Sequence, residues 1–364
     1  MVDTVEAVLV ARGHRVVRYE EDNAALGGVA AAVGGVWSRK ARRGLAAVLA
    51  AERPDVLHVH NLFPALSPSI YAAANASAVP VVQHLHNARL ACMQPFLLRD
   101  GAACRDCVGH SPIAGVVHGC YRGSTVASGA AAAALVTHRV LGTWQRRVAR
   151  FVAVSDAVAE VVRTGGVVPA ERLVVCANGL DSDPGPRPRN GDAAVFVGRL
   201  AYEKGVDLFV DAAAAIPEMQ FVVVGDGPER DALARRAGPN VAFLGARDRA
   251  GVYDALAQAR VLVAPSRGQE PFGLGVIEAA ACRVPAIVSR AGGLPEIVSD
   301  GSTGIVVEPS NAAALVAALR AMTPDAAVRM GDAARRAFEQ RYSPDAFADR
   351  LLAIYDGVLA GYAP

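Results

Sequence analysis

The sequence lacks several features that would place it in other classes of protein. Its 364 residues contain no run of the roughly 18 to 20 apolar residues that a membrane-spanning helix needs, and the stretch Thr125–Val136 stops at His138. The first nine residues carry Asp3 and Glu6 and no basic side chain, unlike a signal peptide. Aromatic residues make up 5% and do not alternate with basic ones. We therefore expect a cytoplasmic protein with no nucleic-acid partner.

Lysine is nearly absent, since Lys40 and Lys204 are the two lysines among 37 basic residues. Because the chain otherwise uses arginine, the presence of lysine at position 204 favours a specific role for Lys204. An ordinary surface lysine is the alternative. Residues 1–180 hold 18 basic and 12 acidic side chains, a net +6, whereas the remainder holds 19 and 23, a net −4. The basic half suits a phosphorylated or lipid-linked acceptor, or a peripheral position at the inner face of the plasma membrane. An ordinary solvated surface is the alternative.

The second half alternates short apolar runs with amphipathic segments, the pattern of βαβ units in a parallel sheet. Strands are expected at Ala193–Val197, Phe221–Val224, Val241–Leu244, Val261–Ala264, Ala286–Ser289 and Ile305–Glu308. Helices are expected near residues 204–215, 228–237, 249–258, 274–282 and 310–321. This pattern predicts an α/β, doubly wound domain over residues 192–341.

The first half shows the same alternation more loosely. Strands are expected at Val16–Tyr19, Asp55–Val59, Val79–Leu85, Phe151–Val154 and Leu173–Cys176, and helices at 39–51, 66–77, 124–149 and 155–164. Residues 1–12 already read as a helix, so the strand and Gly-rich loop that normally open a Rossmann domain are expected to be missing. The predicted domain covers residues 1–183, followed by a proline-rich linker at 184–191. A C-terminal helix is expected at residues 342–364. Either it crosses back to the first domain or it stays with the second.

Three features of the second domain point to a phosphate-bearing ligand. Arg199 and Lys204 follow the first strand, where ligands of open α/β sheets bind and where cations can grip a diphosphate. The segment Glu270–Glu278 contains a Gly-marked helix start, whose backbone N–H groups favour a phosphate. A capped helix with two exposed carboxylates is the alternative. The turn at residues 225–228 is weak evidence by itself.

In combination, these residues resemble the family 4 retaining glycosyltransferases of GT-B architecture, in the bacterial type with a cysteine-containing loop. The Glu-x7-Glu motif of that family matches Glu270 and Glu278, its phosphate-binding Arg and Lys match Arg199 and Lys204, and its Gly-Asp-Gly-Pro turn matches residues 225–228. The resemblance covers nearly the whole chain. It implies two Rossmann-like domains facing a cleft, and a hexose-type sugar transferred with retention from a UDP or GDP sugar. The acceptor would be a glycan, a lipid-linked molecule or a small molecule, as in polysaccharide biosynthesis.

The resemblance also implies roles for individual residues. Arg199 and Lys204 would neutralise the diphosphate leaving group without a metal, Glu270 would contact the donor sugar, and Glu278 would hold the ribose. His86 would face the donor sugar, with His84 as its rival because both lie on one side of a strand. The implied catalytic residues are His86, Glu270, Arg199 and Lys204, and the implied donor-binding residues are Arg199, Lys204, Gly225, Gly245, Phe272, Gly273, Leu274 and Glu278. His58 and His60 are candidates for acceptor contacts.

Four of the six cysteines lie in the loop at residues 92–120. Cys92, Cys104, Cys107 and Cys120 have the spacing C-x11-C-x2-C-x12-C, which suits a structural zinc ion bound by four thiolates. Unligated thiols and a redox role are the alternatives, while a reducing cytoplasm disfavours disulfides. Cys176 and Cys282 read as buried thiols.

Two other functions fit parts of the pattern. A non-hydrolysing sugar-nucleotide epimerase shares the two-domain architecture, and an inactive sugar-nucleotide-binding protein would be compatible with the missing first strand. The segment with Arg139, Trp144, Arg146, Arg147 and Arg150 allows either docking at a membrane surface or packing between domains.

Overall fold

The structure, a computed structural model, describes residues 1–22, 34–63, 65–186 and 191–362. Residues 187–190 of the predicted linker therefore lie outside the described residues. The chain divides into two compact units, each treated by itself below. The first comprises Met1–Arg99, Cys104–Ala177 and Ala348–Pro364, and the second comprises Asp100–Ala103 and Asn178–Phe347.

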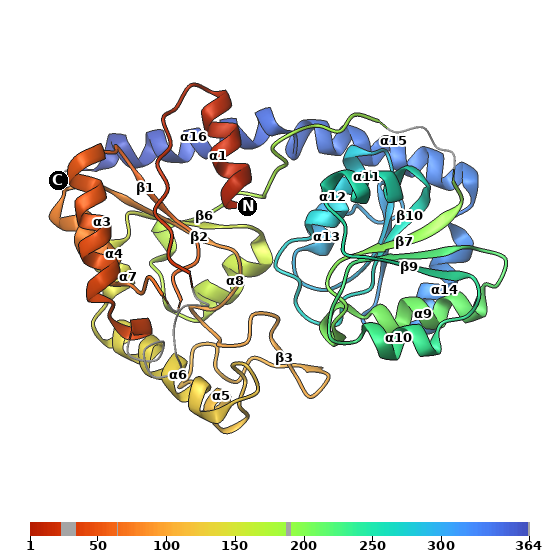
Figure 1. Ribbon diagram of the computed structural model, residues 1–364, viewed down its shortest axis with the longest axis horizontal. Coiled ribbons are helices and arrows are strands. Elements are labelled where there is room, and N and C mark those ends of the chain that lie inside the picture. Colours follow the sequence, from red (N-terminus) through yellow and green to blue (C-terminus); the bar gives the residue numbers. More distant parts are fainter. Residues whose placement is uncertain (23–33, 64, 187–190, 363–364) are drawn as a thin grey trace. The chain divides into compact units, whose positions relative to one another are not determined.

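The second unit is built on a six-stranded parallel sheet with the order β12-β11-β10-β7-β8-β9 (Figure 1). The strands are β7 (Ala193–Val197), β8 (Phe221–Val224), β9 (Val241–Gly245), β10 (Ala259–Ala264), β11 (Ala286–Ser289) and β12 (Gly304–Val307). The chain winds outward in both directions from the pair β7 and β10. The crevice at the carboxyl ends of these two strands is the position where open α/β sheets bind ligands.

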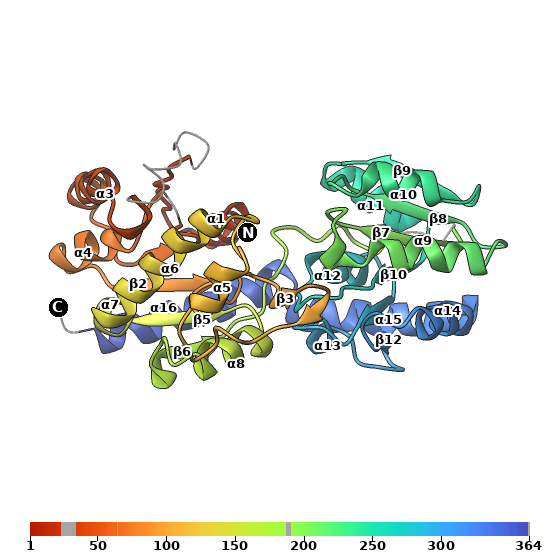
Figure 2. The same cartoon turned by 90° about the horizontal axis from the view of Figure 1, so that it is seen from below.

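Helices cover both faces of this sheet (Figures 1 and 2). In Figure 1, α9, α10 and α14 lie on one face, and α11 and α12 lie on the other. The helical segments are η3 (Tyr202–Lys204), α9 (Val206–Ala215), α10 (Arg230–Arg236), α11 (Arg249–Ala257), α12 (Leu274–Ala281), α13 (Leu294–Ile297), α14 (Ala312–Ala321) and α15 (Pro324–Arg341). Phe209, Phe221 and Leu319, which come from α9, β8 and α14, are fully buried together in the core. This apolar packing fixes the strand ends that carry the polar turns described below.

The first unit contains a four-stranded parallel sheet with the order β1-β2-β5-β6. Its strands are β1 (Leu57–Val59), β2 (Val81–Leu85), β5 (Arg150–Ala153) and β6 (Leu173–Val175). A separate small hairpin pairs β3 (Leu98–Arg99) with β4 (Ala102–Ala103), and β4 belongs to the second unit. All five residues of β2 are buried, as expected for a central parallel strand. The register pairs Val59 with Gln83, so β1 and β2 end side by side.

The helices of the first unit differ widely in length. They are α1 (Val2–Ala11), α3 (Arg39–Glu52), α4 (Ser69–Ala76), α5 (Ile113–Val117), α6 (Thr125–Val140), α7 (Thr143–Arg147), α8 (Asp156–Thr164) and η2 (Ala170–Arg172), and the C-terminal helix α16 (Pro344–Gly361) joins this unit from Ala348 onward. No helix in the described part of the chain is both long and apolar enough to span a bilayer.

Two predictions of secondary structure were wrong, and one long helix was missed. Val16–Tyr19 forms no strand, because no strand of the described residues pairs with it, and Arg18 instead binds Asp3 and Glu6 of α1. The single helix predicted at 124–149 is divided into α6 and α7 by Gly142, whose positive φ of 58° a regular helix does not permit. The helix α15 was not predicted, because its buried face is mainly alanine and its sequence is highly charged.

Candidate functional site

In the second unit, the turn after β7 meets the loop after β10. Lys204 Nζ donates to Glu270 Oε2 at 2.6 Å, and these side chains are 23% and 14% exposed. The Ser266 hydroxyl lies 3.4 Å from the same carboxylate oxygen. Two residues separated by 66 positions in sequence are thus joined at the ligand-binding edge of the sheet. The sequence predicted both residues, but it did not predict that they form an ion pair.

A second ion pair holds this turn and loop together. The Arg267 guanidinium makes two hydrogen bonds to the Asp207 carboxylate, of 2.5 and 2.6 Å, and it stacks over the Tyr202 ring at 4.5 Å. The backbone N–H of Arg267 also donates to the Glu203 carbonyl at 2.9 Å. Bidentate Arg–carboxylate pairs restrict geometry strongly. The Arg267–Asp207 pair therefore positions Lys204 and Glu270.

The turns after β7 and β8 approach each other backbone to backbone. Gly198 N–H donates to the Val224 carbonyl at 3.0 Å, and Leu200 N–H donates to the Asp226 carbonyl at 2.9 Å. Gly225 has a φ of +139°, and a Cβ there would lie 1.9 Å from the Gly198 carbonyl oxygen. A glycine at position 225 is therefore a requirement of this close approach.

Gly225→Ala is expected to lower the midpoint of thermal unfolding by roughly 6 °C or more, because backbone strain and the contact with Gly198 cost about 3 kcal/mol. Gly357→Ala is the matched control. Gly357 lies exposed on α16, and a Cβ there would touch nothing within 4 Å. Alanine in a helix is favoured by up to about 1 kcal/mol, so the control protein should be as stable as wild type or more so. Equal midpoints for the two variants would contradict the assigned role of Gly225.

The start of α12 faces the same edge of the sheet. Its N-cap is Gly273, and no side chain caps it, so the first backbone N–H groups of the helix are available to a ligand. A Cβ on Gly275 would lie 3.8 Å from the Val197 carbonyl oxygen, which places the helix start beside the end of β7. Gly292, after β11, packs against the backbone of Glu270, and a Cβ there would lie 2.0 Å from that carbonyl.

Glu278 lies on α12, one turn beyond this helix start. Burial raises the pKa of Glu278 to about 7, while the nearby Arg249 guanidinium lowers it and Asp181 raises it further. Arg249 and Asp181 form an ion pair with each other. A carboxyl group with a pKa near neutrality is poised to change charge when a ligand binds.

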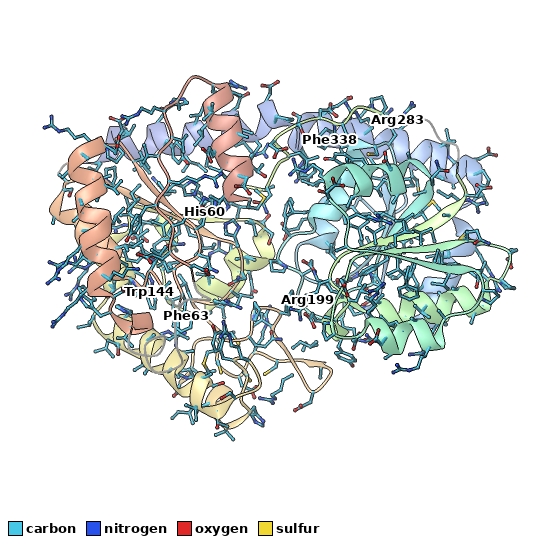
Figure 3. All side chains as sticks on the ribbon, viewed as in Figure 1. His60, Phe63, Trp144, Arg199, Arg283 and Phe338 are labelled. Atoms are coloured by element: carbon cyan, nitrogen blue, oxygen red, sulfur yellow. The ribbon has the colours of Figure 1, made fainter. Side chains whose placement is uncertain are left out.

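The remaining predicted donor-binding residues occupy the same edge to different degrees. Arg199 is well exposed and lies 3.2 Å from the Glu203 carboxylate (Figure 3). Gly245 ends β9, and its carbonyl accepts a 2.9 Å hydrogen bond from Gly225 N–H. Phe272 is 5% exposed, so its backbone rather than its ring is available to a ligand. Leu274, the first residue of α12, is exposed.

In the first unit, four histidines gather where β1 and β2 end. His60 Nδ1 and His86 Nε2 are 2.7 Å apart, and His58 Nε2 and His84 Nδ1 are 3.2 Å apart. The rings of His84 and His86 stack with centroids 4.4 Å apart, so these residues do lie on one side of the strand, as predicted. Burial lowers the pKa of His86 to about 4 and that of His58 to about 3, which keeps both imidazoles neutral at pH 7.

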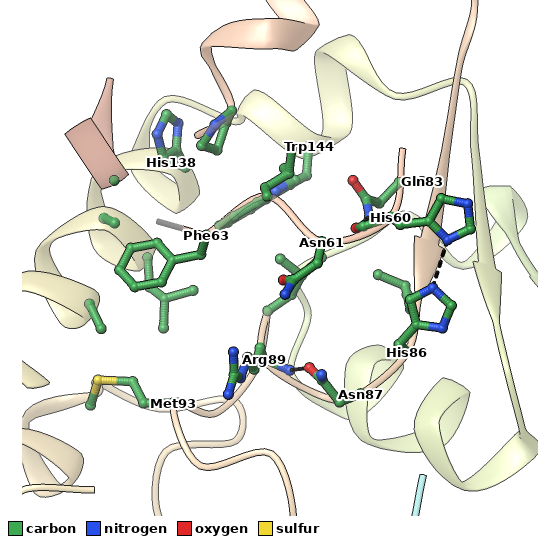
Figure 4. Close-up of a pocket in the computed structure, with 18 of the residues that line it drawn as sticks. His60, Asn61, Phe63, Gln83, His86, Asn87, Arg89, Met93, His138 and Trp144 are labelled. Carbon is green, nitrogen blue, oxygen red and sulfur yellow. Dashed lines mark hydrogen bonds between the residues drawn. The ribbon is translucent and has the colours of Figure 1, made fainter. Parts of the chain in front are cut away.

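A cavity of about 230 Å³ opens beside His60 and His86 in the same unit (Figure 4). Its walls combine apolar and polar groups: Leu62, Phe63, Leu90, Met93, Leu135 and Trp144 on the one hand, and Asn61, Gln83, Asn87, Arg89 and His138 on the other. The Nε atom of Arg89 and the indole Nε1 of Trp144 are buried and have no hydrogen-bond partner among the described residues. The cavity can therefore take a ligand that has both an apolar part and polar or anionic groups.

Parts of the segment for which the sequence allowed membrane docking or packing between domains are packed within the first unit. Trp144 is 2% exposed and lines the cavity, so it cannot anchor the protein at a membrane surface. Arg139 donates to the carbonyls of Leu90, Ala91 and His110, and Arg150 donates to the carbonyl of Glu171.

All six cysteines are described, and none forms a disulfide. Burial raises the pKa of Cys92 to about 12, and the thiols of Cys104, Cys107 and Cys120 are near enough to raise it further. In the described ranges, however, the one group of three or more potential ligands within 4.8 Å of one another is His58, His60 and His84. Zinc binding by the cysteine loop remains a prediction.

Several residues that contact the candidate site residues were not predicted from the sequence. Arg267, Asp207 and Ser266 organise the Lys204–Glu270 pair, and Arg249 and Asp181 surround Glu278. Asp207 has the pattern of an ordinary acidic residue in the first turn of a helix, and no local signal connects it with a residue 60 positions later. Arg267 lies between the predicted strand Val261–Ala264 and Glu270, and this position was the one signal in the sequence that could have identified it.

Two family models match the chain, one on each half. The family described as "Glycosyl transferase 4-like domain" matches residues 2–179, and that described as "Glycosyl transferases group 1" matches residues 191–325. The chain therefore belongs to the family 4 type of glycosyltransferases with GT-B architecture.

Curated relatives and a solved structure agree with this assignment. Glycogen synthase of Mycobacterium tuberculosis is 37% identical over 48% of this chain, and phosphatidyl-myo-inositol mannosyltransferase of Mycobacterium leprae is 28% identical over 76% of this chain and 73% of its own length. The crystal structure of Anabaena Alr3699/HepE in complex with UDP and glucose has 19% identity and a TM-score of 0.65, covering 86% of this chain and 81% of its own, and shows the common fold. The match to glycogen synthase spans 44% of that enzyme's length.

Proposed function

We propose that this protein transfers a sugar, with retention, from a nucleoside diphosphate sugar to an acceptor held by its first unit. The observation that carries the proposal is the Lys204–Glu270 pair of 2.6 Å beside the end of β7, where the fold binds ligands. Membership of a glycosyltransferase family favours transfer over epimerisation. The glucose-containing complex of HepE with UDP supports a UDP-type donor, with a GDP-type donor as the alternative.

In this mechanism, positive charge at the turn after β7 stabilises the departing diphosphate. Lys204 and Arg199 supply that charge, so the leaving group needs no metal ion. The uncapped start of α12, at Gly273 and Leu274, adds backbone N–H groups and the positive end of the helix dipole. Glu270 holds Lys204 in place and contacts the donor sugar. Retention follows if the acceptor attacks the face from which the diphosphate departs.

The cavity in the first unit supports an acceptor of mixed character. Phe63 and Trp144 offer an apolar wall, while Asn61 and Arg89 offer polar contacts, with the Nε atom of Arg89 otherwise unpartnered. We propose that neutral His86, at the mouth of this cavity, hydrogen-bonds the transferring sugar. A lipid-phosphate-linked acceptor combines the apolar and anionic groups that such walls recognise.

Incubation with a panel of UDP and GDP sugars tests the proposal, with release of nucleoside diphosphate as the first readout and NMR of the product's anomeric proton as the second. Acceptor-dependent release and an unchanged anomeric configuration are expected. Inversion would exclude the retaining mechanism. Isomerisation of a nucleotide sugar with no acceptor would identify an epimerase instead.

Binding of the donor should depend on pH through Glu278. A carboxylate accepts hydrogen bonds from both ribose hydroxyls, whereas the free protein begins to protonate this group near pH 7. The affinity for a nucleotide sugar should therefore be constant above pH 7 and fall by up to about tenfold per pH unit below it. Calorimetry at pH 6, 7 and 8 with the nucleotide sugar measures this, because its diphosphate diester does not titrate in that range.

Glu278→Gln is the control for this pH dependence. Its amide should bind the donor roughly tenfold more weakly at pH 8, since one hydrogen bond to a charged group is lost. The slope between pH 6 and 7 should disappear, because the amide of glutamine does not titrate. An affinity of the wild-type protein that does not change with pH would exclude Glu278 as the ribose ligand.

A further inference from the structure

Four imidazoles converge at the ends of two neighbouring strands, and the proposed transfer uses only one of them. His58 and His60 alternate along and beyond β1, and His84 and His86 do so along and beyond β2. Because side chains two residues apart share a face of a strand, all four rings meet on one side of the sheet. The ring centroids of His58, His60 and His84 lie 4.4 to 5.3 Å apart.

We infer that His58, His60 and His84 bind a divalent transition-metal ion, with Zn²⁺ as the natural occupant. One nitrogen from each of the three rings lies within 4.8 Å of the other two. His58 Nε2 and His84 Nδ1 are 3.2 Å apart, close to the roughly 3.4 Å that separates two nitrogens bound to a tetrahedral zinc ion at about 2.05 Å each. His60 supplies the third ligand nitrogen, within 4.8 Å of the other two.

The outer partners of two of these rings fit the pattern of metal-binding histidines. Such a histidine binds the metal through one nitrogen and hydrogen-bonds a second group through the other. His58 Nδ1 lies 2.6 Å from the Tyr355 hydroxyl of α16, and His60 Nδ1 lies 2.7 Å from His86 Nε2. Both contacts use Nδ1, which leaves Nε2 of each ring as its metal-binding nitrogen, and His58 Nε2 lies 3.2 Å from His84 Nδ1. His86 then positions His60 and is not itself a ligand.

His84 is the most deeply buried of the three rings. It is 1% exposed, and its Nδ1 atom lies 3.2 Å from His58 Nε2. A metal ion between these two nitrogens would take a lone pair from each, in place of the single hydrogen bond that they share without it. Three histidines, together with a water molecule, are a complete ligand set for zinc.

An ion at this position would join β1 to β2 and, through Tyr355, to α16. It would lie in the first unit and is independent of the diphosphate site at Lys204. The metal site and the proposed transfer can therefore fail separately. It is also distinct from the cysteine loop, whose thiolates would bind the same metals with a different optical signature.

Cobalt and zinc titrations of the chelator-treated protein test the inference. The first protein is the double variant Cys104→Ser/Cys107→Ser, which removes the competing C-x2-C thiolates. It should bind one equivalent of Co²⁺ with weak visible bands and no sulfur-to-cobalt charge-transfer absorption in the near ultraviolet, and Zn²⁺ should displace the Co²⁺. Loss of all binding in this variant would overturn the inference, because the metal would then belong to the cysteines.

Histidine substitutions then locate the ion. In the same Cys104→Ser/Cys107→Ser background, His84→Gln is expected to weaken Zn²⁺ binding at least about a hundredfold, as measured against a chromophoric chelator. His118→Gln, on the exposed side of the cysteine loop, is the control and should not change it. If His84→Gln fails to fold, Tyr355→Phe gives the second test, with a loss of about tenfold expected. If His84→Gln folds and binds Zn²⁺ as tightly as its parent, the proposed site is wrong. If His84→Gln does not fold, an unchanged Zn²⁺ affinity of Tyr355→Phe overturns the site instead.

Discussion

Replacing Lys204 by methionine is expected to lower the rate constant for sugar transfer by roughly a hundred- to a thousandfold. A preorganised cation at a leaving diphosphate contributes about 3 to 4 kcal/mol to transition-state stabilisation. Lys204 Nζ is held at 2.6 Å from Glu270, and the turn that carries it is fixed by the Arg267–Asp207 pair. The charge is therefore in place before the donor arrives. Steady-state kinetics with the donor that the panel of UDP and GDP sugars identifies measures the loss.

The sequence supplies a matched control for this experiment. Lys40 is the other lysine of the chain, and its side chain is 83% exposed in a surface pair with Glu21. Lys40→Met should leave the rate of transfer within about twofold of wild type, since exposed ion pairs contribute little. Equal losses for the two variants would show that Lys204 has no special role. Circular dichroism of both proteins must first show the wild-type fold.

Asp207→Ala is expected to destabilise the second unit by about 3 kcal/mol. The substitution leaves the Arg267 side chain, 8% exposed, without its bidentate partner, and a buried charge that loses its partner is costly. The loop carrying Glu270 should loosen as well, so donor affinity should fall about tenfold. Chemical unfolding followed by far-ultraviolet circular dichroism measures the change in stability. Isothermal titration calorimetry measures the change in donor affinity.

A comparable ion pair on the surface provides the control for Asp207→Ala. Arg290 and Glu308 are more than half exposed and contact each other at 2.8 Å. Glu308→Ala should change stability by less than about 0.5 kcal/mol. If both alanine variants behave alike, the Arg267–Asp207 pair does not organise the site.

The sheet of the second unit was predictable from the sequence because each strand is a short apolar run bounded by glycine or proline. β8 and β11 have the predicted bounds, and β10 begins two residues earlier than predicted. Parallel strands buried on both faces give this strong signal. The signal fails where a segment has no neighbouring strand among the described residues, as at Val16–Tyr19, and where alanine forms the buried face, as in α15.

The sequence identified the residues of the candidate site, but it did not predict which of them contact one another. Lys204 stood out because lysine is scarce, and Glu270 and Glu278 stood out by their spacing. That Lys204 binds Glu270, and that Asp207 binds Arg267, depends on which strands are adjacent in the sheet. For the same reason, the sequence predicted His84 and His86 on one side of a strand but not the stack that they form with His58 and His60. Strand order is a property of the whole domain.

The central claim is that a nucleoside diphosphate sugar binds at the edge formed by Lys204, Glu270 and the start of α12. Isothermal titration of UDP and GDP sugars into the wild-type protein and into Lys204→Met tests it most directly. We predict that nucleotide sugars with one of the two bases, uracil or guanine, bind at a single site. Lys204→Met should weaken this binding at least tenfold. Binding of neither class, or equal binding to both proteins, would contradict the account.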